Sequence, residues 1–202
     1  MSEEVTKMSG EALYFGSKSG KKRPRSRWLR LQDKDKIPVR FMQGPDEAEI
    51  AAEKKQPIGF TFCYVHSKLI DPETGRAVYD TICPPEGSCP LDLEGHYPTY
   101  VFYAVVIDGT DAKARIIKHG MMFYNSFIRP ALDEYGTLTD RWFTYSRIGT
   151  HQQTTWGFIA KDKAKLEKKY EEVKMIDLRK VLVVPRPEEL EKYLTTMDDL
   201  ED

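Results

Sequence analysis

The sequence predicts a mainly β protein with a few helices, an α+β fold centred on a small β-barrel. Short runs rich in β-branched and aromatic residues recur along the chain, and turn signals such as Asp108-Gly109 separate them. The chain has 202 residues, of which 40% are hydrophobic and 11% aromatic, enough for one substantial core. Residues 66–98 form a connection that is too long and turn-rich for an ordinary loop, so we expect a metal ion to order it.

The strand-like runs begin after a polar N-terminal stretch. They carry the Val, Ile, Tyr, Phe and Trp residues that fit a pleated, half-buried surface. We expect strands at residues 27–31, 37–42, 58–65, 99–107, 113–118, 141–147 and 153–159.

Helical patterning interrupts these strands. In residues 121–135 the apolar side chains fall near one face, Gly136 is the expected C-terminal stop, and Pro130 should split or kink the helix. Residues 162–173 have a charged, helix-forming composition with a thin apolar stripe. A short helix is expected within residues 187–194.

Charge is distributed unevenly, although the formal net charge is only −1. Residues 18–40 contain ten Lys or Arg and two Asp, whereas residues 187–202 contain seven Asp or Glu and one Lys. This pattern predicts a flexible basic arm over residues 1–26, a folded domain over residues 27–186 that includes the 66–98 insertion, and an acidic C-terminal tail. The basic segment indicates a site for a polyanion.

Aromatic residues flank the basic segment, a combination typical of nucleic-acid contact. Lys and Arg neutralise phosphates and release condensed counterions, while exposed rings stack on unpaired bases. In the simpler interpretation, the basic run is a solvated tail and each strand aromatic packs in the core. The DNA-binding candidates are Lys21, Lys22, Arg23, Arg25, Arg27, Trp28, Arg30, Arg40, Tyr100, Phe102, Arg141, Phe143, Tyr145 and Arg147.

The cysteines share one short window of the chain with His66. Cys63 and His66 have a spacing that allows both side chains to bind one ion, and Cys83 and Cys89 follow beyond a turn. Asp92 offers a harder oxygen ligand beside them. These residues predict a Zn²⁺ site; the alternative is a set of ordinary reduced cysteines, with Cys63 facing the core.

Enzyme motifs are missing from the sequence. It contains no Gly-rich phosphate loop, HExxH or GxSxG pattern, so we do not expect an enzyme. No apolar run approaches the roughly 20 residues that span a bilayer, so no membrane association is expected. The acidic N-terminal segment and the odd number of cysteines favour a reducing cytoplasm.

The order of these motifs carries a family resemblance. After the basic arm come Trp28-Leu-Arg-Leu-Gln and the following strand, then His66, Cys83 and Cys89-Pro-Leu, and finally Tyr135-Gly-Thr-Leu-Thr-Asp-Arg-Trp-Phe. In this order the chain resembles the phage-encoded single-stranded-DNA-binding proteins of the helix-destabilising type. The resemblance covers about residues 10–160.

The resemblance implies a five-stranded OB-fold with a zinc-stabilised insertion ligated by His66, Cys83 and Cys89. Where the family pattern has a further cysteine, this chain has Asp92, so either Asp92 ligates, or Cys63 takes its place, or the ion has been lost. The resemblance also implies a non-catalytic protein that coats single-stranded DNA (ssDNA), with little sequence preference, during phage DNA replication and recombination in the host cytoplasm.

Partners follow from the two charged ends. The basic arm is expected to contact neighbouring copies along the strand, which would make self-association on DNA cooperative. The acidic tail resembles those by which such proteins recruit replication or recombination partners. The competing interpretations are a zinc-stabilised adaptor that binds protein through residues 66–98, and a metal-dependent nuclease.

Overall fold

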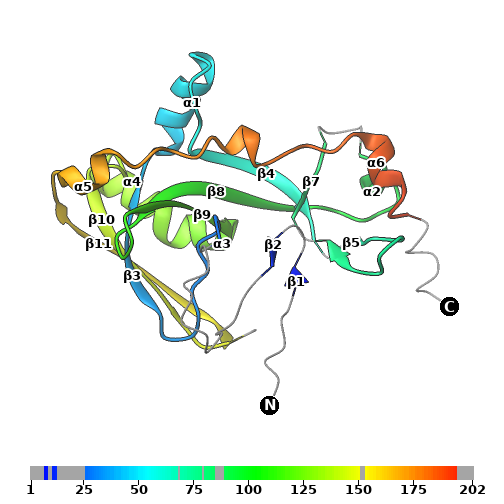
Figure 1. The fold of residues 1–202 in the computed structure, drawn as a ribbon, viewed down its shortest axis with the longest axis horizontal. Coiled ribbons are helices and arrows are strands. Elements are labelled where there is room, and N and C mark those ends of the chain that lie inside the picture. Colours follow the sequence, from blue (N-terminus) through cyan, green and yellow to red (C-terminus); the bar gives the residue numbers. More distant parts are fainter. Residues whose placement is uncertain are drawn as a thin grey trace. The chain divides into compact units, whose positions relative to one another are not determined.

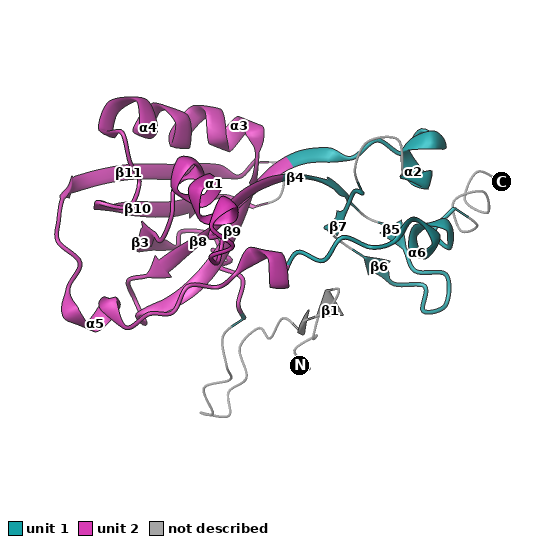
Figure 2. Cartoon of the chain, turned by 90° about the horizontal axis from the view of Figure 1, so that it is seen from above, with its two compact units in different colours: residues 1–26, 63–100, 182–202 teal, residues 27–62, 101–181 magenta. Residues whose placement is uncertain are grey.

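A computed structural model of the protein describes residues 26–67, 69–78, 80–84, 89–150 and 153–194, together with the backbone of the short strands β1 (Lys7–Met8) and β2 (Glu11–Ala12) (Figure 1). The chain divides into two compact units (Figure 2). Unit 1 comprises residues 1–26, 63–100 and 182–202, and unit 2 comprises residues 27–62 and 101–181. The predicted 66–98 insertion therefore lies within unit 1.

Unit 2 is built on a mostly antiparallel sheet. The strands run in the order β11-β10-β3-β8-β4, and β9 pairs with β8 off this path. Their bounds are β3 (Lys36–Phe41), β4 (Phe60–His66), β8 (Thr99–Asp108), β9 (Lys113–Gly120), β10 (Arg141–Ile148) and β11 (Thr155–Lys163).

This arrangement confirms the α+β class, but the sheet is not closed into a barrel. Among the described residues β11 pairs with β10 alone, so no pairing joins this edge strand to another edge of the sheet. The expected strand at 27–31 is reduced to one parallel bridge between Trp28 and Ile116, supported by the hydrogen bond from the Leu29 N–H to the Ile116 carbonyl. The other expected strands all form, within a few residues of their predicted ends.

Helices cover the sheet of unit 2. The predicted 121–135 helix is divided into α3 (Met121–Phe123), a π-helical turn η1 (Tyr124–Ile128) and α4 (Arg129–Tyr135). Pro130 lies in the first turn of α4 and has no N–H to donate to the preceding turn, which accounts for the widened segment before it. Gly136 ends α4 in the left-handed region, at φ 72°, as expected.

Elsewhere in unit 2 the helix predictions and the structure differ. The helix expected over residues 162–173 is limited to α5 (Lys168–Glu171), because β11 extends to Lys163. α1 (Pro45–Glu53) was not expected; it begins with Pro45 and has the acidic first turn that favours a helix N-terminus. A 3₁₀ turn follows α5 at Leu178–Lys180.

The core of unit 2 is aromatic. Phe60 stacks on Phe102 with ring centroids 5.6 Å apart, and Phe143 stacks on Phe158 at 4.6 Å. β8 is buried on both faces from Val101 to Asp108, so it forms the centre of the unit. Such large, fully buried rings dominate the hydrophobic stabilisation of a core.

Unit 1 has its own short elements and a smaller core. The end of β4 pairs with β7 (Thr81–Ile82), and β5 (Leu69–Ile70) pairs with β6 (Ala77–Val78). α2 (Pro90–Leu93) and α6 (Pro187–Glu191) complete it. In the described part of the chain, no helix has the length and apolar character required to cross a membrane.

Candidate metal centre and exposed tyrosine surface

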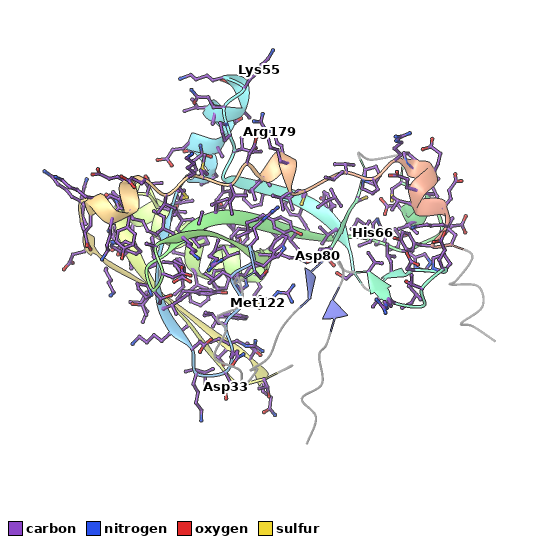
Figure 3. All side chains as sticks on the ribbon, viewed as in Figure 1. Asp33, Lys55, His66, Asp80, Met122 and Arg179 are labelled. Carbon is purple, nitrogen blue, oxygen red and sulfur yellow. The ribbon has the colours of Figure 1, made fainter. Side chains whose placement is uncertain are left out.

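Four potential ligand atoms converge in unit 1. His66, Cys83, Cys89 and Asp92 each offer one such atom, and these atoms all lie within 4.8 Å of one another (His66 is labelled in Figure 3). His66 Nε2 lies 3.2 Å from Cys89 Sγ and 3.5 Å from Asp92 Oδ1, and Cys83 Sγ lies 3.5 Å from Asp92 Oδ2. Tetrahedral bonds of about 2.0–2.3 Å place ligand atoms roughly 3.3–3.8 Å apart. The cluster could therefore hold a metal ion.

Local backbone structure brings these side chains together. The N–H of Cys83 donates to the Tyr64 carbonyl at 2.8 Å, which holds the segment after β7 against β4. Cys89 is the extended residue before α2, and Pro90 fixes the first helical position. Asp92 then falls in the first turn of α2, one helical turn after Cys89.

The charges of the cluster suit a cation. Asp92 Oδ1 is buried and has no hydrogen-bond partner, which is costly for a carboxylate oxygen unless a cation satisfies it. Burial lowers the pKa of His66, against an opposing effect of Asp92, so the ring favours the neutral form that ligates metals. Burial, followed by the effects of Cys89 and Asp92, raises the pKa of Cys83. A divalent ion would offset this crowding of acidic groups.

Cys63 does not belong to this cluster, which corrects its assignment as a ligand. Both Cys63 and His66 lie in β4, and residues three apart in a strand point to opposite faces. In a turn, the spacing of Cys63 and His66 would bring both side chains to one ion. In a strand, the same spacing places them on opposite faces. Cys63 is half-buried and reduced.

An exposed tyrosine surface lies in the same unit. We use this name for Tyr64, Tyr97 and Tyr100, whose exposed fractions are 52%, 83% and 38%. The rings of Tyr64 and Tyr100 have centroids 4.6 Å apart and planes inclined at 35°. The sequence prediction includes Tyr100 but not Tyr64 or Tyr97; burial does not alternate along β4, so no period-2 pattern marks Tyr64 as exposed.

Three of the predicted stacking residues are instead part of the core. Phe102 and Phe143 are completely buried, and Tyr145 is 2% exposed. A ring without an accessible face cannot stack on a base, so the structure corrects this role for all three. Trp28 is half-buried and packs edge-on against Tyr103, with centroids 5.7 Å apart.

The predicted arginines divide in the same way. Arg27 and Arg30 are exposed. Arg40 is buried and donates from Nε to the Thr139 carbonyl and from Nη1 to the Ala164 carbonyl, both at 2.8 Å. These bonds make Arg40 a structural residue and not a phosphate contact.

The arginines of β10 are also structural. Arg141 is buried and pairs with Asp140 at 2.8 Å. Arg147 is half-buried and donates from Nη1 to the Leu31 carbonyl at 2.7 Å. The structure therefore corrects the prediction that Arg141 and Arg147 contact DNA. The remaining candidates, Lys21, Lys22, Arg23 and Arg25, lie outside the described residues.

A half-buried histidine lies among the core rings of unit 2. His119 stacks on Phe123 with ring centroids 3.8 Å apart, and its Nε2 lies 2.7 Å from the Tyr145 hydroxyl. Burial, and secondarily the charge of Lys118, lowers the pKa of His119 to about 3. The ring is therefore neutral in the folded protein at ordinary pH.

We expect His119 to make unit 2 less stable in acid. An unfolded histidine titrates near pH 6.5, so below that pH the unfolded chain takes up a proton that the folded chain excludes. The free energy of unfolding should therefore be fully retained above about pH 7 and fall by about 1.4 kcal/mol per unit between about pH 6 and pH 4. Urea unfolding followed by tryptophan fluorescence measures this. His119→Phe should show the shallower pH dependence, and equal slopes in the two proteins would contradict the assignment.

Comparison with models of known protein families, with curated proteins and with solved structures returns no match. The site must therefore be interpreted from its own chemistry.

Proposed function

We propose that the protein binds single-stranded DNA without catalysing a reaction, and that Zn²⁺ stabilises the part of unit 1 that carries the exposed tyrosine surface. The observation that carries the proposal is the Tyr64–Tyr100 pair. These two aromatic rings lie side by side and are both exposed to solvent, although contact between apolar ring surface and water is unfavourable. Base stacking uses ring faces and tolerates any base. A surface of this kind therefore suits a ligand of variable sequence.

The basic segment supplies the second requirement, contact with phosphates. Arg27 and Arg30 are exposed in unit 2, and the positive charges of residues 18–25 precede them in the chain. Lys and Arg at this density give binding that depends on salt and little on sequence. The proposed contacts are Lys21, Lys22, Arg23, Arg25, Arg27, Arg30, Tyr64, Tyr97 and Tyr100.

Zn²⁺ is the proposed ion because two thiolates and an imidazole match its preference for sulfur and nitrogen. His66, Cys83 and Cys89 are the softer ligands, and Asp92 is the fourth. The role of the ion is structural: with four protein ligands no open position remains for a substrate.

The finer fold class and the biological setting belong to the same proposal. The antiparallel strands of unit 2, with sequence-distant neighbours such as β10 beside β3 and β3 beside β8, support a divergent OB-type sheet. The proposed setting is phage DNA replication and recombination. The proposal also includes cooperative contact between copies of the protein on DNA and recruitment of partner proteins by the acidic tail.

A salt titration of fluorescent oligo-dT, run beside duplex DNA and RNA, tests the proposal. We expect tight binding to oligo-dT at low salt and much weaker binding to duplex, because paired bases offer no free faces. The logarithm of the binding constant should fall linearly with the logarithm of salt concentration, by about 0.7 per phosphate contacted. Equal affinity for duplex, or no binding at low salt, would refute the proposal. Intact oligonucleotide after incubation with Mg²⁺ excludes the nuclease alternative.

A further inference from the structure

The small core of unit 1 links residues 66–98, which carry the potential metal ligands, to α6, almost a hundred residues later in the chain. Its buried members are Leu69, Cys89, Leu91, Leu190 and Tyr193. Cys89 is therefore both a potential metal ligand and a core residue, with 1% exposure. Leu190 of α6 and Tyr193, which follows α6, belong to the same core.

α6 is firmly fixed to this core. Leu190 is completely buried and Tyr193 is 7% exposed, and α6 packs against α2 (Figure 1). The Arg186 N–H donates to Glu189 Oε2 at 2.8 Å, which defines the start of the helix. Lys192 Nζ lies 3.6 Å from Asp71 Oδ2 in the β5–β6 turn, which links the segment after α6 to this turn.

α2 depends on this packing because it cannot be stable alone. It has only four residues, and helices of that length do not persist in water without tertiary contacts. Its first turn nevertheless carries Asp92, and its N-terminal flank carries Cys89. The placement of these two ligands is thus determined by what Leu91 packs against.

We infer that α6 is a positioning element of the metal centre, in which Leu190 and Tyr193 hold α2 so that Cys89 and Asp92 face the ion. The inference rests on the proposed metal centre and is independent of DNA binding. Coupling between two sites is reciprocal, so an ion bound by Cys89 and Asp92 also holds α6 in place. The ion would then fix the root of the acidic tail.

The test is the metal affinity of Leu190→Ala and Tyr193→Ala in the full chain, measured by chelator competition with Zn²⁺ and by Co²⁺ absorption. Residues that support metal ligands typically contribute about 10–100-fold to affinity. We expect at least a tenfold loss and a changed Co²⁺ d–d spectrum in each variant. Leu190→Met and Tyr193→Phe should restore both. Val184→Ala, an exposed residue before α6, is the matched control and should bind as the wild type does.

The tryptophans separate this effect from general unfolding. Trp28, Trp142 and Trp156 all belong to unit 2, so their fluorescence reports that unit alone. An unchanged tryptophan signal with weakened metal binding supports the inference. Wild-type affinity and an unchanged Co²⁺ spectrum in both alanine variants overturn it. A wild-type chain that binds neither ion overturns the metal centre itself, whatever the oligo-dT titration shows.

Hydrogen exchange tests the reciprocal effect in the unmodified chain. The amides of residues 189–194 should exchange at least tenfold faster when a chelator removes the ion, because α6 then loses a fixed partner. The amides of β10 in unit 2 serve as the internal control. Equal exchange with and without chelator would contradict the coupling.

Discussion

Cys89→Ser is expected to abolish stoichiometric metal binding and to loosen unit 1 while unit 2 stays folded. The thiolate is one of four proposed ligands, and Cys89 also packs in the small core, so its replacement removes a proposed bond to the ion and places a more polar hydroxyl among apolar side chains. Metal affinity should fall by at least about 100-fold, since structural Zn²⁺ sites bind with about 10–16 kcal/mol and share it among four ligands. Metal analysis of the purified protein measures the loss.

Two matched variants sharpen this result. Cys63→Ser should retain the ion, because Cys63 lies on the opposite face of β4 from His66. Asp92→Cys should bind Zn²⁺ more tightly than the wild type, because a thiolate is the softer ligand. Loss of the ion in Cys63→Ser together with its retention in Cys89→Ser would show that the ligand set is wrong.

The double replacement Tyr64→Ala with Tyr100→Ala is expected to produce the largest loss of ssDNA affinity. Each stacked base contributes about 1–3 kcal/mol, which corresponds to roughly 5- to 150-fold per ring. The salt dependence of binding should stay as it is, because no phosphate contact is removed. Fluorescence anisotropy with oligo-dT at several salt concentrations measures both quantities.

The controls for this variant keep the surface but change its chemistry. Tyr64→Phe with Tyr100→Phe retains both ring faces and should bind nearly as the wild type does. Leu93→Ala removes an exposed side chain of the same unit that has no ring, and should have little effect. If the double alanine variant binds oligo-dT with wild-type affinity, the exposed tyrosine surface is not the binding site.

The members of the potential metal cluster could be predicted from the sequence, whereas the exposed tyrosines other than Tyr100 could not. Residue type alone marks the cluster, because one turn-rich segment contains thiol, imidazole and carboxylate groups together: His66, Cys83, Cys89 and Asp92. Phe102 was misjudged because period-2 alternation assumes that one face of a strand is solvated. β8 is buried on both faces, so alternation along it carries no information about exposure.

Other features lay beyond local patterns. The charge of Arg40 predicts a phosphate contact, but its partners are the carbonyls of Thr139 and Ala164, about a hundred residues away in the chain. The contact of α6 with α2 is equally remote in sequence. A short charged helix near an acidic tail gives no local sign that Leu190 will be completely buried.

The separation of Leu91 from Leu190 bears on how the protein is made. A ribosome that adds about 5–20 residues per second needs roughly 5–20 s to pass from the first of these leucines to the second. During that interval the nascent thiols of Cys83 and Cys89 are present without their final packing partner. If the proposed ion binds before Leu190 leaves the ribosome, residues 66–98 of unit 1 fold before α6. If it binds afterwards, the two segments fold together.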